Sequence, residues 1–367
     1  MNQLDKFKLR IVDYYIIRKF LGTFFFALLM IITIAVIFDI SEKIDDFITK
    51  HATAKQVIFD YYLNFIPYFA VLFSSLFTFI SVIFFTSKMA YNSEIIAILS
   101  SGMSFRRLLY PYILSAAFLS SFSFLLSNYV IPKANQKRFA FEEVYVRANP
   151  YDYVKRNIHQ QVEPGTFIYM ESFNNSSSIG FKFSMEKFEG NILVSKLMAD
   201  YIKWDSITNK WQLNNYYIRK INGTKETLTK GIKKDTIVKI DPKEFKRRDN
   251  FVEAMSIHEL NAYIKLMKLQ GADNLSLFII EREKRLAYPF STFILTMIGV
   301  TLSTRKVRGG IGVHIGIGLT LSFAYILFMQ FSSQFAISGA LSPMLAAWIP
   351  NIIFAGISMY LYRIAPK

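Results

Sequence analysis

Glu94 is the acidic side chain with the most distinctive surroundings in this sequence. It is the only acid in residues 88–107, whose other charged residues are Lys88, Arg106 and Arg107. A carboxylate in such a position can accept a charge-assisted hydrogen bond from an arginine of a partner molecule. The alternative is that Glu94 only offsets the positive charges around it. Apolar and small residues recur with the spacing of one helical face, at Ile95, Ile98, Leu99 and Gly102.

Basic side chains gather beside the long uncharged stretches of the chain. Such cations can hold the phosphate groups of an anionic ligand. Among the candidates, Lys43 is less favourable for anion binding than the others, because the acids Glu42, Asp45 and Asp46 lie close to it in sequence. The candidates for anion binding are Lys43, Lys133, Lys137, Arg138, Arg282, Lys284 and Arg285.

The sequence lacks the residue patterns of common catalytic and metal sites. It has no cysteine, and its four histidines have no metal-ligand spacing such as H-E-x-x-H. No G-x-x-x-x-G-K-[ST] motif is present for nucleotide binding. We therefore expect no catalytic residue, no metal and no cofactor. Any energy source must then lie on another chain.

The elements that position these residues are predicted to be membrane helices. Residues 309–362 are 54 consecutive positions without Asp, Glu, Lys or Arg. A bilayer-spanning helix needs about 20 apolar residues, so this stretch fits two spans and a turn. Four further uncharged stretches bring the total to six. The predicted spans are Phe20–Phe38, Tyr61–Ser87, Leu108–Pro132, Leu286–Thr304, 311–335 and 343–362.

The distribution of positive charge predicts the orientation of these spans. The N-terminal segment, the loops after spans 2 and 4 and the C-terminal tail carry thirteen Lys/Arg against three acids, a net charge of +10. On the opposite side, residues 39–56 hold three lysines against four acids. The positive-inside rule therefore places both termini in the cytoplasm. Residues 12–19 are expected to form an interfacial helix. The net charge of +16 then gives no reason to expect nucleic acid as a partner.

Residues 133–285 interrupt the spans and are too polar to enter a bilayer. Alternating apolar and polar residues between turn signals predict short antiparallel strands in a sandwich or partial barrel. Ser256-Ile257-His258-Glu259 then predicts the capping box of a helix that ends near Gln270. A second helix is expected from about Asn274 into span 4. The predicted strands are Thr166–Glu171, Ile179–Phe188, Ile192–Ile202, Trp211–Arg219 and Thr236–Ile240.

Five stretches in a fixed order carry a resemblance to a known family. They are residues 12–21 (VDYYIIRKFL), 92–104 (NSEIIAILSSGMS), 288–310 (YPF…IGVTLS…RGG), 211–215 (WQLNN) and 345–351 (LAAWIPN). Together they resemble the LptF/LptG permease family of the lipopolysaccharide exporter, over nearly the whole chain. Whether the chain is LptF-like or LptG-like stays open.

The resemblance implies a half-transporter in the bacterial inner membrane. The half-transporter pairs with a second LptF/LptG-type permease. Two copies of the ATPase LptB bind this pair on its cytoplasmic side. An LptC-like periplasmic jellyroll protein receives the lipopolysaccharide. The fold expected is an α-helical membrane protein with six transmembrane helices (3+3) and an inserted periplasmic all-β, jellyroll-like sandwich domain. The expected domains are 1–132 (interfacial helix and spans 1–3, with a cytoplasmic coupling helix at 88–107), 133–255 (β domain), 256–285 (periplasmic linker helices) and 286–367 (spans 4–6).

The resemblance also implies roles for individual residues. Glu94 would dock in a groove of the ATPase, on a surface that includes Ile95, Ile98, Leu99, Gly102 and Met103. The basic candidates would hold lipid phosphates, unless they extend to headgroups of ordinary membrane lipids. Spans 1 and 5 line a lateral gate in relatives. The lining candidates there are Phe24, Phe25, Phe323 and Phe328, and the alternative for them is ordinary lipid contact.

Two other functions compete with this hypothesis. One is a membrane sensor or scaffold whose β domain binds an external ligand. The other is an intramembrane enzyme that acts on lipid, which the missing catalytic pattern disfavours. The short loop at 88–107 suits a transporter better than a receptor. A copurifying ATPase would support export, and a stable homodimer alone would favour the other two functions.

Overall fold

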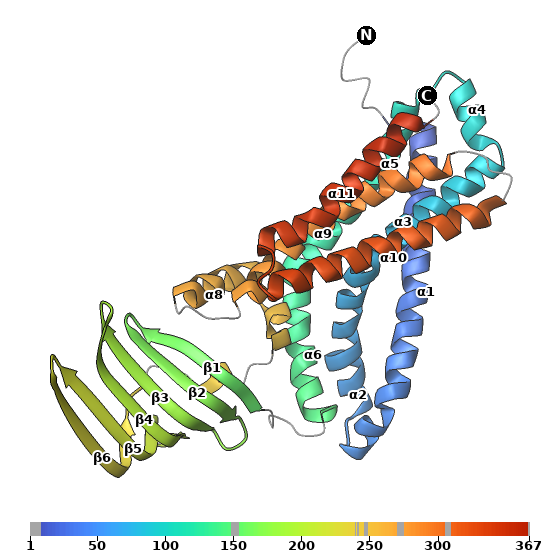
Figure 1. Cartoon of the computed structure of the whole chain (residues 1–367). Helices are drawn as coiled ribbons and strands as arrows, with labels where there is room; N and C mark the ends of the chain where they lie inside the picture. The colour runs from blue at the N-terminus through green and yellow to red at the C-terminus, as the bar shows by residue number, and fades with distance from the viewer. Residues whose placement is uncertain are drawn as a thin grey trace. The chain divides into compact units, whose positions relative to one another are not determined.

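The computed structural model describes residues 9–147, 154–238, 240, 242–245, 249–269, 275–304 and 310–365. The chain divides into two compact units, one of Met1–Phe141 with Ser276–Lys367 and the other of Glu142–Leu275. The first holds the long helices of Figure 1, and the second holds the sheet. We call them the helical unit and the β unit.

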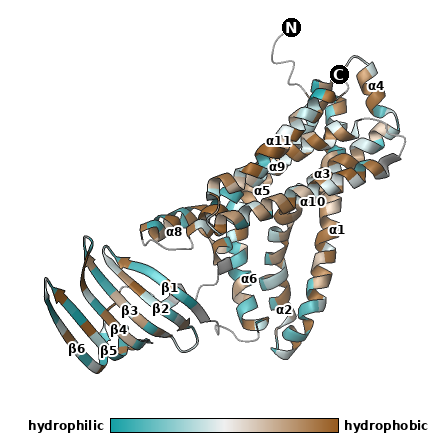
Figure 2. Ribbon diagram, in the orientation of Figure 1, coloured by the Kyte–Doolittle hydropathy of each residue, from teal (hydrophilic) through white to brown (hydrophobic). Residues whose placement is uncertain are grey.

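Six helical segments are long and apolar enough to cross a membrane, and each coincides with a predicted span. Figure 2 shows how much of their surface is hydrophobic. The six-span prediction is therefore confirmed. The segments are α1 (Ile11–Thr49); α2 (Ala54–Gln56), the π-helical η2 (Val57–Tyr62) and α3 (Leu63–Tyr91); α5 (Phe105–Leu125), the π-helical η3 (Leu126–Val130) and α6 (Ile131–Tyr145); α9 (Leu275–Ser303); α10 (Gly310–Ile337); and α11 (Pro343–Ile364).

The first helix includes the segment that was expected to lie at the interface. α1 runs unbroken from Ile11 to Thr49, so residues 12–19 are its first turns rather than a separate helix. No proline interrupts this stretch, and the hydroxyls of Thr23 and Thr33 donate to carbonyls four residues earlier, at 2.8 and 2.9 Å. These bonds satisfy polar side chains inside the apolar part of α1.

α3 is the helix on which both halves of the helical unit pack. One apolar cluster joins it to α1 and α5, and a second joins it to α9, α10 and α11. Glycines allow the close approach of two of these helices. A Cβ atom at Gly299 of α9 would lie 2.8 Å from Cγ1 of Val82, and one at Gly318 of α10 would overlap Ile83. Small residues at such crossings are typical of packed membrane helices.

The β unit is built on one antiparallel sheet whose six strands follow each other in sequence order (Figure 1). Tight turns with positive-φ glycines at Gly165, Gly190 and Gly223 join three of the strand pairs. This arrangement confirms an inserted antiparallel β domain between spans 3 and 4. The strands are β1 (Val154–Glu163), β2 (Thr166–Asn174), β3 (Ile179–Glu189), β4 (Ile192–Asp205), β5 (Lys210–Asn222) and β6 (Lys225–Thr236).

Four of the five predicted strands lie within β2–β5, but the fifth prediction is wrong. Thr236 ends β6, and Ile237, Val238 and Ile240 do not belong to a strand. Val238 and Ile240 instead pack into the core of the β unit, where the carbonyl of Ile240 accepts a hydrogen bond from Trp211 Nε1 at 3.3 Å. The alternation pattern does not predict β1 or β6. β6 is exposed on both faces and rich in lysine, as edge strands often are.

A line of irregular residues crosses the sheet and changes which side chains face the core. Asn157, Lys182 and Asn215, on the alternate strands β1, β3 and β5, have φ angles of 51°, 51° and 47°. The strand registers skip all three residues. On β3, Gly180 and Phe183 are therefore both buried while the two residues between them are exposed. On β3 the left-handed residue thus shifts the alternation of buried and exposed side chains by one position without adding a residue to the strand pair.

Short helices follow the sheet: α7 (Pro242–Phe245), the 3₁₀ segment η4 (Asp249–Ala254) and α8 (Ile257–Leu269). The predicted capping box is confirmed, because the Ser256 N–H donates to Glu259 Oε2 at 2.8 Å and the Glu259 N–H donates to Ser256 Oγ at 3.3 Å. The bond from the Ser256 N–H holds the pKa of the Glu259 carboxyl below its usual value. The expected helix end near Gln270 lies outside the described residues, and α9 confirms the helix leading into span 4.

Candidate coupling and lipid-contact sites

The loop between α3 and α5 holds a short helix, α4 (Glu94–Ser100), with Glu94 as its first residue. Ser93 before it has a φ of 65°, which turns the chain sharply. Glu94 Oε2 accepts a hydrogen bond from the Tyr15 hydroxyl of α1 at 2.9 Å, and Oε1 accepts one from Asn92 Nδ2 at 3.3 Å. Among the described residues, no ion pair joins Glu94 to a basic side chain of its own loop.

A second contact ties the start of α5 to the start of α1. The guanidinium of Arg107 binds both oxygens of Asp13, with Nη1 donating to Oδ1 at 2.7 Å and Nη2 donating to Oδ2. Asp13 is 1% exposed, and its Oδ2 also accepts the N–H of Arg10 at 2.6 Å, which caps α1. Because Asp13 and Tyr15 lie two residues apart, the first turns of α1 hold the beginning of α4 and the beginning of α5 together.

The far side of the same loop is attached to α11. Arg106 Nε donates to the Tyr362 hydroxyl at 3.2 Å, and the rings of Phe105 and Tyr362 lie 6.1 Å apart. The loop is thus fixed to the first and the last helix of the helical unit. A displacement of α4 has to move α1 or break these contacts.

The predicted apolar face of α4 packs mainly on the chain itself. Ile95 is fully buried, and Ile98 and Leu99 are partly buried against the cluster that joins α1, α3 and α5. α4 ends at Ser100, so Gly102, with a φ of 88°, and Met103 lie beyond the helix. The surface left for a partner therefore includes Glu94, Gly102 and Ile96, which is 51% exposed.

Sequence analysis missed Tyr15, Asp13 and Ile96 as parts of this site. Tyr15 is 79 positions from Glu94, and Asp13 is 94 positions from Arg107. No periodicity within one segment can reveal pairs so far apart. Their only signal is that residues 12–21 and 92–104 both belong to the stretches that carry the family resemblance.

Lys43, one of the basic candidates, is held by its own neighbours. It pairs with Asp39 one helical turn earlier and bonds to the hydroxyl of Tyr61. The hydroxyls of Tyr61 and Tyr62 donate to the two oxygens of Asp39 at 3.2 and 3.1 Å. The charge of Lys43 is therefore largely neutralised inside this cluster.

The candidates at the start of α9 also have partners. Arg282 Nη2 donates to Glu283 Oε1 at 2.7 Å, and Arg285 Nε donates to Glu281 Oε1 at 3.0 Å. Arg285 is only 5% exposed, and Lys284 is partly buried. These ion pairs leave little free positive charge for a ligand.

α6 carries the remaining three basic candidates. Arg138 is buried, with its guanidinium 4.7 Å from the ring centres of Tyr68 and Phe139. Lys133 and Lys137 are exposed and lie four residues apart, hence on one helical face. Neither forms an ion pair with a residue that the structure describes. This lysine pair is the best-placed cationic group of the seven for an external anion.

The four phenylalanines proposed for the gate differ in their exposure. Phe24 is 2% exposed and belongs to the cluster around α1, whereas Phe25, Phe323 and Phe328 are 42%, 56% and 42% exposed. Their helices, α1 and α10, both pack against α3. Phe24 thus supports packing within the chain, and the other three side chains are available to lipid or to another subunit.

Across the described ranges, no three His, Cys, Asp or Glu side chains come together in a way that could hold a metal ion. Six membrane-capable helices, a loop fixed to two of them and an inserted antiparallel sheet define a multi-pass membrane protein.

Comparison with models of known protein families identifies the family of this membrane protein. The model of the lipopolysaccharide export system permease LptF/LptG matches residues 14–364, and the chain belongs to this family. It is therefore a permease of the lipopolysaccharide export transporter, with a role in that transporter complex. No curated protein matches the chain closely enough to serve as a relative for comparison.

Proposed function

We propose that the chain is one permease subunit of an ABC transporter that extracts lipopolysaccharide from the inner membrane and passes it to a periplasmic bridge. A separate cytoplasmic ATPase drives it. The observation that carries this proposal is the family match over residues 14–364. The charge distribution supports an orientation with both termini and the α4 loop in the cytoplasm and the β unit in the periplasm.

Coupling to the ATPase runs through Glu94 and the exposed edge of α4. A carboxylate has about four acceptor positions, and Tyr15 and Asn92 together take two of those on Glu94. An arginine of the ATPase can therefore bind Glu94 without displacing them. Because Tyr15 and Asp13 connect α4 and α5 to α1, a push on α4 is transmitted to the first span. The side chains of Ile95, Ile98 and Leu99 pack α4 against the core of the helical unit. Gly102 and Met103, just beyond the helix, form the edge of the surface that contacts the ATPase.

The substrate requires a route that keeps its acyl chains out of water. Each exposed CH₂ group costs about 0.8 kcal/mol, so a chain of a dozen carbons costs roughly 10 kcal/mol. Exposed aromatic rings on α1 and α10, at Phe25, Phe323 and Phe328, supply an apolar wall for that route together with a second permease of the same family. Lys133 and Lys137 supply positive charge for the lipid phosphates.

The partners follow from this assignment. The complex contains a second LptF/LptG-type permease, two copies of the ATPase LptB and an LptC-like periplasmic jellyroll protein. In this scheme residues 1–132 and 286–367 form the membrane part, residues 133–255 the periplasmic β domain and residues 256–285 its linker helices.

The experiment that tests the proposal is affinity purification from native membranes with mass spectrometry of bound proteins and bound lipid. We expect a stoichiometric ATPase, a second permease and lipopolysaccharide. The Glu94→Ala variant should no longer copurify with the ATPase but should still copurify with the second permease. Glu42 is an acid on α1 away from the loop, and the Glu42→Ala variant should copurify with both. A stable homodimer without ATPase or lipid would instead support a sensor or scaffold.

A further inference from the structure

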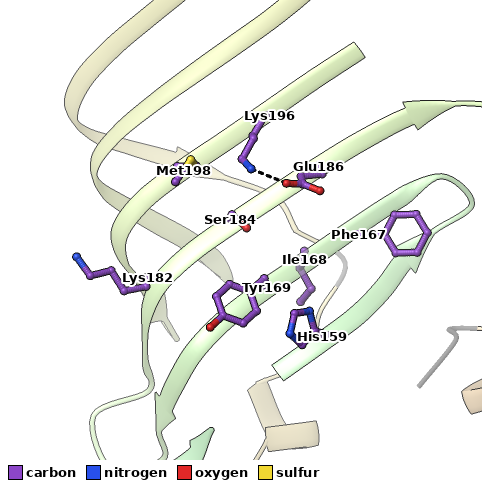
Figure 3. A pocket seen from close by; sticks show the side chains of 9 residues that line it. All are labelled: His159, Phe167, Ile168, Tyr169, Lys182, Ser184, Glu186, Lys196 and Met198. Atoms are coloured by element: carbon purple, nitrogen blue, oxygen red, sulfur yellow. Dashed lines mark ion pairs between the residues drawn. The ribbon is translucent and has the colours of Figure 1, made fainter. Parts of the chain in front are cut away.

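One face of the sheet, opposite the packed core of the β unit, carries a shallow cavity. The strand registers place His159, Tyr169, Ser184 and Met198 in one outward-facing row across β1–β4. The next row holds Phe167, Glu186 and Lys196 on β2, β3 and β4. These side chains line a cavity of about 400 Å³ (Figure 3), which is within the size range of small-ligand sites.

Aromatic rings form one side of this cavity. The rings of His159 and Tyr169 lie 4.6 Å apart, and Phe167 leaves 41% of its surface exposed. The electron-rich face of an aromatic ring attracts the weakly positive C–H groups of a flat, partly apolar ligand. A sugar ring is a ligand of this kind, because one of its faces presents C–H groups and its edge presents hydroxyls.

Charged and polar groups form the other side. Figure 3 shows Ser184 between Lys182 on one side and the pair of Lys196 and Glu186 on the other. Lys196 Nζ lies 2.7 Å from Glu186 Oε1, so these two charges offset each other. Lys182, whose positive φ turns it away from the core, has no ion pair with a described residue. The cavity thus has at one margin an ammonium group without an ion-pair partner among the described residues, with a hydroxyl and a carboxylate farther along β3.

The dimensions and the chemistry exclude an acyl chain as occupant. The cavity extends about 13 Å along β3 and about 14 Å across four strands, which gives room for one or two sugar rings. An acyl chain would remove three charged side chains from water without replacing their hydrogen bonds, at a large cost in free energy. An anionic sugar offers a C–H face to the aromatic rings, hydroxyls to Ser184 and Glu186, and a negative charge to Lys182.

We propose that this cavity binds an anionic saccharide. The sugar ring stacks on Tyr169 and His159, its hydroxyls bond to Ser184 and Glu186, and its phosphate or carboxylate pairs with Lys182. The headgroup of an acidic glycolipid and a free sugar phosphate share this chemistry. The site is independent of Glu94, so it stands whether or not the chain exports lipid.

The test is ligand binding to the full-length chain in nanodiscs of zwitterionic lipid, by isothermal titration calorimetry. Glucose 1-phosphate should bind saturably, and glucose and inorganic phosphate should each bind at least tenfold more weakly. Vesicles with a phosphorylated glycolipid displace the probe if the natural ligand is a headgroup and leave it bound if the ligand is a free sugar phosphate. Preference for an acidic peptide, or no binding of glucose 1-phosphate, would overturn the proposal.

Two variants localise the site without disturbing the backbone. Lys182→Asn removes the charge and keeps a residue that tolerates a positive φ, and Tyr169→Ala removes the ring. Each should weaken glucose 1-phosphate binding at least tenfold, while Tyr169→Phe retains it. Lys203→Asn changes an exposed lysine of β4 outside the cavity and should leave binding unchanged. Wild-type affinity in both Lys182→Asn and Tyr169→Ala, with the sheet intact by circular dichroism, would contradict the assignment.

Discussion

Replacing Asp13 with asparagine isolates the contact that ties α1 to the loop. The change keeps the size of the side chain and removes its charge, so the buried face of Arg107 loses its anionic partner. Removing one partner of a buried ion pair lowers the free energy of unfolding by about 3–5 kcal/mol. The Arg107 side chain is 20% exposed, so water replaces part of the lost interaction. We therefore expect Asp13→Asn to lower the free energy of unfolding by about 3 kcal/mol, the bottom of that range.

The assay is equilibrium unfolding of the purified chain in mixed micelles with increasing dodecyl sulfate. A double-mutant cycle with Arg107→Met separates the pair from each residue's other contacts, and residues in one such contact couple by about 0.5–3 kcal/mol. The control is Asp45→Asn, the same change at an exposed position of the same helix, where the effect should stay within about 0.5 kcal/mol.

A specific result would refute this reasoning. If Asp13→Asn were no more destabilising than Asp45→Asn, the bidentate contact would contribute nothing to stability. A coupling energy of zero between positions 13 and 107 would lead to the same conclusion. In either case the Asp13–Arg107 contact does not hold the start of α5 to α1, and this pair provides no physical basis for transmitting motion from the loop to the first span.

Three further predictions concern packing and capping. Gly180→Val places a branched side chain against Met170, and overpacking of this kind costs about 1–3 kcal/mol; faster hydrogen exchange in β2–β4 would confirm it. Asn351→Leu in α11 removes 2.9 Å hydrogen bonds to the Tyr325 hydroxyl and the Ala287 carbonyl and should cost about 1–3 kcal/mol in the micelle assay. The lowered pKa of Glu259 adds stability that is present at neutral pH and lost as the pH falls through that pKa. Hydrogen exchange in α8 should therefore differ between wild type and Glu259→Ala at pH 7, and the difference should vanish in acid.

The spans were predictable because their signal is local and strong. A charged residue at the centre of a membrane helix costs about 2.5–3.5 kcal/mol, so the uncharged stretches mark the helices directly. The capping box at Ser256 was predictable for a similar reason, since both of its hydrogen bonds join residues three positions apart. Boundaries were less predictable, because α1 continues past its uncharged stretch at both ends.

The strands at the sheet edges and the left-handed residues within strands were not predictable from alternation. β6 has one neighbour and no buried face, so its residues show no period of two. At Lys182 the alternation shifts by one position, because a lysine adopts a left-handed conformation that the sequence does not signal. The contacts of Glu94 with Tyr15 and of Arg107 with Asp13 depend on tertiary packing alone.

The burial of the coupling candidates also needed the structure. Helical spacing groups Ile95, Ile98 and Leu99 on one face but does not say what that face meets. In the fold it meets the chain's own core, which leaves Glu94 and Ile96 on the accessible side of α4.

The most direct test of the proposed function is lipid transfer in a reconstituted system. Proteoliposomes containing this chain, its copurifying permease and ATPase, and lipopolysaccharide are mixed with the soluble periplasmic acceptor, and lipid on the acceptor is measured with and without ATP. The account predicts transfer that requires ATP and is lost with Glu94→Ala but not with Glu42→Ala. Transfer that proceeds without ATP, or that is unchanged when this chain is omitted, would contradict it.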